Sequence, residues 1–183
     1  AVVDALKSAL DVTANHKYGF QQGLPAYREA AVRWVERRFG QRFDAYTEML
    51  PLIGSKEGIA HLALATLNRG DTVLVPNPSY PIHIYGPVIA GADIRQIPLV
   101  PGVDFFAELE HTIRMSFPKP KMLILNFPAN PTAQCVELDF FKHVVGIARE
   151  HNIYVIHDLA YADLVFDGYR APSIMEVQGA KDI

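Results

Sequence analysis

The stretch DTVLVPNPSYPIHIYGPVIAGADIRQIPL, residues 71–99, holds the pattern that decides the fold. Its two short apolar runs, 72–75 and 94–97, predict buried β-strands, and a helical pattern lies between successive runs of this kind. The same order continues with the runs at 122–125 and 153–156. Because strands that alternate with helices are joined by crossover connections, the sequence predicts an α/β fold with a mostly parallel sheet and helices on both faces.

Two of the connecting helices carry clear end signals. The first is predicted to end at Gly70 in a left-handed cap, and its apolar face contains Ile59, Leu62, Ala63 and Leu67. The second is predicted over 138–148 with Asn152 as its cap, and its apolar face contains Phe141, Val144, Val145 and Ala148. An earlier apolar run at 49–53 predicts one more strand, at an edge or a bulge, because Pro51 lacks a backbone donor.

The N-terminal part differs from the rest, because it shows helix and loop signals without strands. Helices are predicted over 4–10 and 25–39, joined by a glycine-punctuated loop at 18–23. The second helix begins with a proline and is followed by a glycine, as is usual at helix starts and ends. We therefore expect an N-terminal helical segment, residues 1–40, and one larger domain, residues 41–183.

The composition and charge of the chain indicate which kinds of partner to expect. The chain has 183 residues, 50% of them hydrophobic, which suits one domain with a real core, and its net charge is −3 with no cluster of Lys or Arg. These features argue against nucleic acid and membranes as partners and favour small molecules. Cys135 is the single cysteine and cannot form an internal disulfide, and no leader or bilayer-spanning run is visible. A cytoplasmic location is expected, and no metal site.

Four polar clusters follow predicted strands, at the places where open parallel sheets bind ligands. They are Gly54-Ser55-Lys56-Glu57-Gly58, Asn77-Pro78-Ser79-Tyr80-Pro81, Asn130-Pro131-Thr132, and Asp158 with Tyr161. The first three clusters have an ordinary structural explanation when each is taken alone. Ser55 could cap a helix, the two prolines could fix a loop around Tyr80, and Asn130-Pro131 could start a turn.

Three of the clusters also have a functional interpretation. A helix that opens at Ser55 would present unpaired backbone N–H groups to a phosphate, and a rigidly held Tyr80 ring could lie over a flat aromatic ligand. Asp158 is the sharpest signal, because a carboxylate at the end of an apolar strand needs a cationic or donating partner, such as a protonated ring nitrogen. The adjacent His157 should point to the opposite face of the strand, so it is interpreted as structural.

Taken in order, the clusters resemble the large domain of the class I and II aminotransferases, which are pyridoxal-phosphate (PLP)-dependent transferases of fold type I. The matching segments are Tyr18-Gly19 leading to Gly23-Leu24, Gly54 to Gly58, Asn77 to Pro81, Asn130-Pro131-Thr132, and Asp158-Leu159-Ala160-Tyr161. The resemblance covers the whole chain and implies a three-layer αβα domain. Within the family, the amino-acid sequence at 76–86 and 130–136 is most similar to that of bacterial glutamate-pyruvate and LL-diaminopimelate aminotransferases.

The resemblance also implies roles for single residues. Asp158 would pair with the protonated pyridine nitrogen, and Asn130 and Tyr161 would donate hydrogen bonds to the phenolic oxygen of the ring. Tyr80 would stack on the ring, and the backbone of Ser55 and Lys56 would hold the phosphate. Tyr18 would reach the phosphate in a neighbouring subunit, which implies a homodimer; its ordinary alternative is loop packing.

The sequence departs from the family pattern in one respect: no lysine stands where the family forms its Schiff base. In relatives that lysine follows a Ser-rich segment beyond the Asp-x-x-Tyr motif. Lys181 comes too early and follows Gly179-Ala180, and Lys56 opens a helix in the phosphate turn. The arginine that clamps the substrate carboxylate is also missing, so the chain is expected to be a fragment that supplies the cofactor cradle and is inactive alone.

The function implied by the resemblance is transfer of an amino group between an amino acid and a 2-oxo acid. Two alternatives remain, because a fold does not settle chemistry. The first is another PLP-dependent reaction, such as that of a C–S lyase or a decarboxylase. The second is a non-catalytic regulatory module that keeps the cradle without the lysine, although the chain shows no basic DNA-binding helix.

Overall fold

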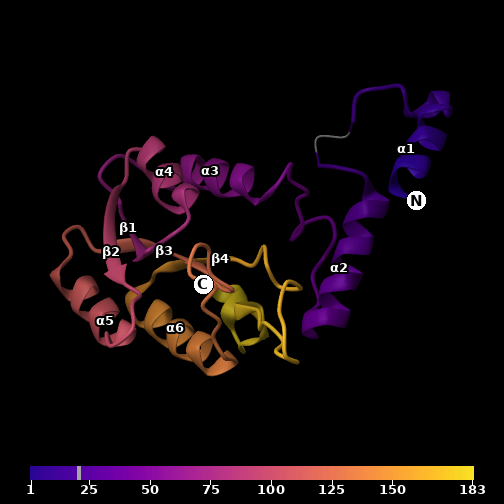
Figure 1. Ribbon diagram of the computed structural model, residues 1–183. Coiled ribbons are helices and arrows are strands. Elements are labelled where there is room, and N and C mark those ends of the chain that lie inside the picture. Colours follow the sequence, from indigo (N-terminus) through magenta and orange to yellow (C-terminus); the bar gives the residue numbers. More distant parts are fainter. Residues whose placement is uncertain (20–21) are drawn as a thin grey trace. The chain divides into compact units, whose positions relative to one another are not determined.

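The computed structural model describes residues 1–19 and 22–183, and it consists of two compact units (Figure 1). Unit 1 contains Ala1–Arg38 and Arg42–Pro51, and unit 2 contains Phe39–Gln41 and Leu52–Ile183. These units are defined by contacts within the chain and not as folding domains. The domain boundary that the sequence predicts after residue 40 therefore stays a prediction.

Unit 1 is built of helices and loops, as the sequence predicts. Helix α1 spans Val2–Leu10, the short 3-10 helix η1 spans Thr13–Asn15, and α2 spans Pro25–Phe39, with its last residue in unit 2. Gly40 follows α2 with a φ of +69°, which confirms the expected glycine exit. Phe20 and Gln21, in the loop predicted at 18–23, lie outside the described residues.

Unit 2 contains a four-stranded sheet in the order β2-β1-β3-β4, in which every pair is parallel. The strands are β1 Thr72–Asn77, β2 Asp93–Pro98, β3 Pro120–Asn126 and β4 Tyr154–Asp158. All but the last residue of β1 are buried, as expected for a central strand that is covered on both faces. The four strands predicted at 72–75, 94–97, 122–125 and 153–156 are thus confirmed.

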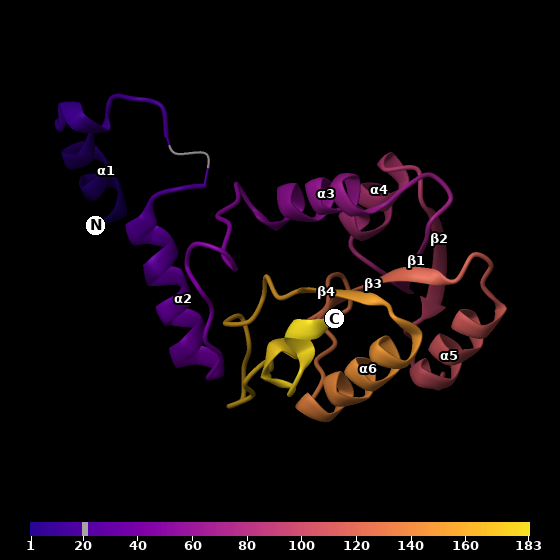
Figure 2. The ribbon, with the colours of Figure 1, turned by 180° about the vertical axis from the view of Figure 1, so that it is seen from behind.

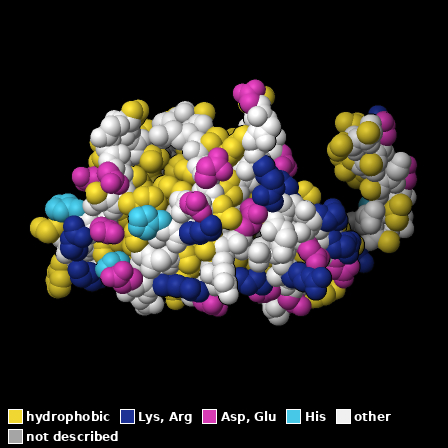
Figure 3. All heavy atoms as spheres, turned by 90° about the horizontal axis from the view of Figure 1, so that it is seen from below, with side chains coloured by type: hydrophobic (Ala, Val, Ile, Leu, Met, Phe, Trp, Pro, Cys, Tyr) yellow, Lys and Arg dark blue, Asp and Glu magenta, His cyan; other side chains and the backbone are white. Residues whose placement is uncertain are grey.

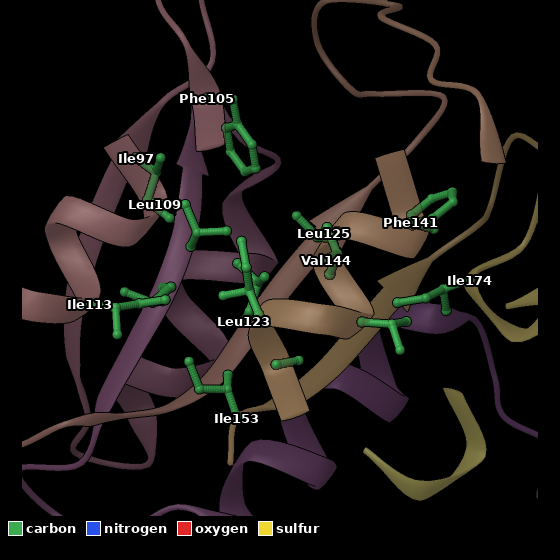
Figure 4. Close-up of a cluster of buried hydrophobic side chains, with 14 of the residues drawn as sticks. Ile97, Phe105, Leu109, Ile113, Leu123, Leu125, Phe141, Val144, Ile153 and Ile174 are labelled. Carbon is green, nitrogen blue, oxygen red and sulfur yellow. The ribbon is translucent and has the colours of Figure 1, made fainter. Parts of the chain in front are cut away.

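Helices cover both faces of this sheet, so the predicted three-layer αβα arrangement is confirmed (Figure 2). On one face lie α3 (Ser55–Thr66) and α4 (Pro81–Ile89), and on the other lie α5 (Phe105–Met115) and α6 (Leu138–His151). Alternate side chains of one strand enter the two cores, because successive side chains of a strand point to opposite faces. Met122 and Ile124 pack toward α3, whereas Leu123 and Leu125 pack toward α5 and α6 (Figure 4).

The connections reverse direction between β1 and β3. The chain leaves β1 through α4 toward β2, and it leaves β3 through α6, on the other face, toward β4. The loops that follow β1 and β3 therefore diverge at the carboxyl edge of the sheet. In open α/β sheets, a reversal of this kind opens a crevice where ligands bind.

Helix α6 ends as predicted. Asn152 adopts the left-handed conformation with a φ of 54° and a ψ of 50°, and its backbone N–H donates to the carbonyl oxygens of Ala148 and Arg149. The helix itself runs three residues beyond the predicted 138–148, because Arg149, Glu150 and His151 continue it on the solvent side.

Two predictions about the segments before β1 are wrong. Residues 49–53 form no strand, and both Leu50 and Ile53 are exposed, because Pro51 lacks the donor that a ladder needs and no core covers these side chains. Gly70 has the positive φ that was expected, +85°, but it does not cap α3. That helix ends at Thr66 and Leu67 is extended, so Gly70 serves the turn that enters β1.

The surface carries charges of both signs. On the face drawn in Figure 3, Lys and Arg side chains are interspersed with those of Asp and Glu, without a broad area of one sign. This distribution agrees with the small net charge of −3. No helix in the described part of the chain is both long and apolar enough to span a membrane.

Candidate functional site

Most of the polar residues singled out in the sequence gather at the carboxyl edge of the sheet in unit 2. β1 ends at Asn77, β3 at Asn126 and β4 at Asp158. Since the strands are parallel, the loops that follow them emerge at one edge, next to the reversal between β1 and β3. Tyr80, Asn130 and Tyr161 lie in these loops.

Asp158 is the buried carboxylate of this edge. The residue is 8% exposed, and its Oδ2 accepts a hydrogen bond from Nε2 of His83 at 3.0 Å. The other ring nitrogen of His83, Nδ1, lies 3.0 Å from Oγ of Ser79. An ionised carboxylate only accepts hydrogen bonds, so Nε2 carries a hydrogen, and in a neutral ring Nδ1 accepts one from the Ser79 hydroxyl. No described residue donates to the second carboxylate oxygen, Oδ1.

His83 is a site residue that sequence reasoning missed. It lies in the first turn of α4 and is fully buried. The available signal was a histidine inside the otherwise apolar helix PIHIYGPVI, because a buried polar side chain requires a partner. The sequence did not say which partner, since Asp158 lies 75 residues away.

Asn126 is the second missed residue, and it joins the loops that follow β3 and β4. Its Nδ2 donates to the backbone oxygen of Asp158 at 2.8 Å, and its Oδ1 accepts from the backbone N–H of Asn130 at 2.8 Å. The side chain of Asn130 donates in turn from Nδ2 to the phenol oxygen of Tyr161 at 3.0 Å. The structure thus places Asn130 and Tyr161 together, as a pair of polar groups beside Asp158.

The turn before α3 presents backbone donors at the start of a helix. Gly54 has a φ of 86° and a ψ of 154°, and α3 begins at Ser55 without a side-chain cap. The alternative in which Ser55 caps the helix is therefore wrong, because Ser55 is the first helical residue. Glu57 turns back to accept from the N–H of Ile53 at 2.7 Å, so among the described residues its carboxylate does not occupy the first N–H groups of α3, which suit an anion.

Lys56 and Tyr80 connect this turn to the rest of the edge. The Lys56 Nζ lies 5.1 Å from the centroid of the Tyr80 ring, and its interaction with the Tyr80 phenol raises the pKa of Lys56. The Tyr80 ring meets the His83 ring edge-on at 5.9 Å. Contacts therefore run from Lys56 through Tyr80 and His83 to Asp158, and from there through Asn126 to Asn130 and Tyr161.

His157 points away from these residues, which confirms its structural interpretation. Its Nδ1 accepts from the backbone N–H of Ile174 at 3.3 Å, so Nε2 is the donor to the carbonyl oxygen of Phe127 at 3.2 Å. Burial against the ring of Phe141 lowers the pKa of His157 to about 4. The side chain is thus a neutral bridge between two loops on the α6 side of the sheet.

Tyr18 belongs to unit 1 and is fully exposed. The structure gives it no position relative to the residues of unit 2, so its contact with a neighbouring subunit stays a prediction. Within the described ranges, no group of three or more His, Cys, Asp or Glu side chains is placed to hold a metal ion.

Comparisons with known proteins agree on one family. The model of "Aminotransferase class I and II" matches residues 1–183. The glutamate-pyruvate aminotransferase AlaC of Escherichia coli is 58% identical over 182 residues, and the LL-diaminopimelate aminotransferase of Desulforudis audaxviator is 42% identical; each match covers 100% of this chain.

A solved structure agrees with these sequence matches. The probable N-succinyldiaminopimelate aminotransferase from Thermus thermophilus superposes with a TM-score of 0.89 and 36% identity over 100% of this chain. The chain spans 44% and 46% of the two sequence relatives and 49% of the solved structure, which is under half of their length in each case.

Proposed function

The chain belongs to the class I and II aminotransferases, and from this premise we propose that it forms the cofactor cradle of a PLP-dependent enzyme that moves an amino group between an amino acid and a 2-oxo acid. The observation that carries the proposal is the continuous set of contacts from Lys56 to Tyr161 at the carboxyl edge of the sheet. It joins the groups that such a cofactor requires.

The residues present fit pyridoxal phosphate. Its phosphate suits the uncapped N-terminus of α3 after Gly54, where backbone N–H groups and the helix dipole favour an anion. Its pyridine nitrogen suits Asp158, whose Oδ1 has no donor among the described residues. Its phenolic oxygen suits the Asn130 and Tyr161 pair, and its flat ring suits the face of Tyr80.

When bound, the cofactor supplies a cationic ring that accepts electrons from the substrate. Asp158 would hold the proton on the ring nitrogen, because a carboxylate beside a cation stabilises its charged form. His83 keeps that carboxylate in place by a hydrogen bond, and Ser79 in turn fixes the His83 ring. Asn130 and Tyr161 would orient the ring in its plane, and burial of Asp158 keeps water from weakening its charge.

The substrate pair is proposed to be glutamate and pyruvate, or closely related acids. Support comes from the 58% identity with an enzyme of that name, which exceeds the 42% identity with an LL-diaminopimelate aminotransferase. We also propose a cytoplasmic homodimer in which Tyr18 contributes to the site of the other subunit. The exposure of both Tyr18 and the free thiol of Cys135 agrees with this proposal.

These 183 residues alone are proposed to bind the cofactor without turning substrate over. Among the described residues, Lys56 is the lysine in contact with the cradle. Its ammonium lies 5.1 Å from the centroid of the Tyr80 ring and its pKa is raised, which opposes the deprotonation that a covalent role requires. Lys119 and Lys121 lie at the start of β3, the end of the strand opposite the cradle.

The test is a cofactor titration of the folded chain, followed by the visible absorbance of pyridoxal phosphate. Saturable binding is expected for the wild type and for Asp93→Ala, whose carboxylate is exposed at the start of β2. Asp158→Ala should bind far more weakly while keeping the wild-type circular dichroism spectrum. Equal binding by both alanine variants would contradict the proposal that Asp158 belongs to a cofactor site. A keto-acid acceptor assay on the whole protein would separate transamination from elimination or decarboxylation.

A further inference from the structure

Lys56 occupies an unusual place for an exposed lysine. It is the second residue of α3, and its side chain extends to Tyr80, where the ammonium nitrogen lies 5.1 Å from the ring centroid. The pKa of Lys56 is raised, chiefly through its interaction with the Tyr80 phenol. Lys56 therefore stays protonated beside the Tyr80 ring.

The backbone positions of the two residues are fixed relative to each other. Lys56 stands in the first turn of α3, and Tyr80 is the N-cap residue of α4, directly before Pro81. The two helices pack closely, since a Cβ on Gly86 of α4 would lie 3.5 Å from the Cα of Ala60 in α3. The contact of Lys56 with Tyr80 therefore joins two rigid elements.

The Tyr80 ring, by contrast, needs side-chain contacts to hold its orientation. It is half-buried, and the edge of the His83 ring meets it at 5.9 Å and an interplanar angle of 72°. Lys56 makes the other contact, and it comes from a different helix. A cation held over an aromatic ring restricts its rotation and stabilises one orientation.

We infer that Lys56 is a positioning residue, whose ammonium holds the Tyr80 ring in the orientation in which it covers the cofactor. The inference rests on the proposed function for the ring that Tyr80 covers, but the contact of Lys56 with Tyr80 exists without cofactor. Lys56 thus has two separate tasks in the cradle. In the proposed cradle its backbone N–H would face the phosphate, whereas its side chain would orient the Tyr80 ring.

A double-mutant cycle tests the inference through the dissociation constant of pyridoxal phosphate. Lys56→Met keeps the backbone N–H and should weaken binding about two- to fivefold, the range for one partly exposed cation–π contact. Lys56→Arg should restore most of the affinity, because a guanidinium also stacks on aromatic rings. In a Tyr80→Leu background, Lys56→Met should have little further effect. Additive losses would overturn the inference, because they would mean that the ammonium binds the phosphate directly.

A second measurement needs no cofactor. With ¹³C at the Cζ of tyrosine, the Tyr80 resonance, assigned by its loss in Tyr80→Leu, should move in Lys56→Met and return toward its wild-type position in Lys56→Arg. The control is Lys142→Met, which removes an exposed lysine paired with Asp139 on α6 and should leave the resonance in place. An unmoved Tyr80 signal in Lys56→Met would overturn the inference. Failure of the wild type to bind pyridoxal phosphate would instead overturn the proposed cradle.

Discussion

His83 and Asp158 are 75 residues apart in the chain, yet His83 Nε2 and Asp158 Oδ2 lie 3.0 Å apart in the interior of unit 2. The bond joins the first turn of α4 to the last residue of β4. The carboxylate at the end of β4, next to β3, is thus held by a histidine of α4, the helix that follows β1. The geometry of the candidate site therefore depends on the complete sheet.

Replacement of His83 by leucine should lower the free energy of unfolding by about 2–3 kcal/mol, because it leaves a buried carboxylate without its donor. Ser79→Ala should cost less, about 1 kcal/mol, since only one neutral hydrogen bond is lost. Urea unfolding measures both values. The control is His111→Gln on the exposed side of α5, which should be neutral; a similar loss in all three variants would contradict a specific role for His83.

The half-buried His157 should make stability depend on pH. Its pKa is lowered from 6.5 to about 4, so between these values the unfolded chain binds more protons than the folded one. The free energy of unfolding should therefore fall as the pH decreases from about 6.5 to about 4, by a total on the order of 2–3 kcal/mol. His157→Gln should flatten this dependence, as measured by urea unfolding at several pH values, whereas His111→Gln should preserve it.

The turn at Gly54 should tolerate no side chain. Its φ of 86° with a ψ of 154° is a conformation that only glycine adopts easily, so Gly54→Ala should cost about 1–3 kcal/mol and disturb the N-terminus of α3. Gly146 lies within α6 with open space around it, and Gly146→Ala should raise stability by about 0.5–1 kcal/mol. Thermal unfolding compares the two. Equal shifts of the same sign would refute the conformational explanation.

The cap of α6 offers a similar test at Asn152, whose φ is 54°. Asn152→Ala should destabilise the chain by about 1 kcal/mol, because a β-carbon without a polar group disfavours the left-handed region. Asn152→Gly should be at least as stable as the wild type, since glycine adopts this region freely. If alanine and glycine behaved alike in urea unfolding, the cap would not be under conformational control.

The sequence alone predicted the layers of unit 2. The buried runs that became β1 to β4 are continuous and lie at regular intervals, so periodicity and the rules for crossover connections were sufficient to predict a parallel sheet with helices on both faces. The cap at Asn152 and the exit at Gly40 followed from local backbone preferences. Where a neighbouring segment decides the outcome, prediction failed: residues 49–53 have the composition of a strand but no core to cover them.

The site divides in the same way. The ends of the strands are visible in the sequence, so the order of strands and polar clusters was sufficient to place Asp158, Asn130 and Tyr80 at one edge of the sheet. Tertiary structure alone decided that His83 meets Asp158, that Asn126 joins two loops and that Lys56 reaches Tyr80. The physical reason is the separation along the chain of the residues that interact. A helix or strand is specified by neighbours a few residues apart, whereas a buried hydrogen bond forms between whichever polar groups the packed layers bring within about 3 Å.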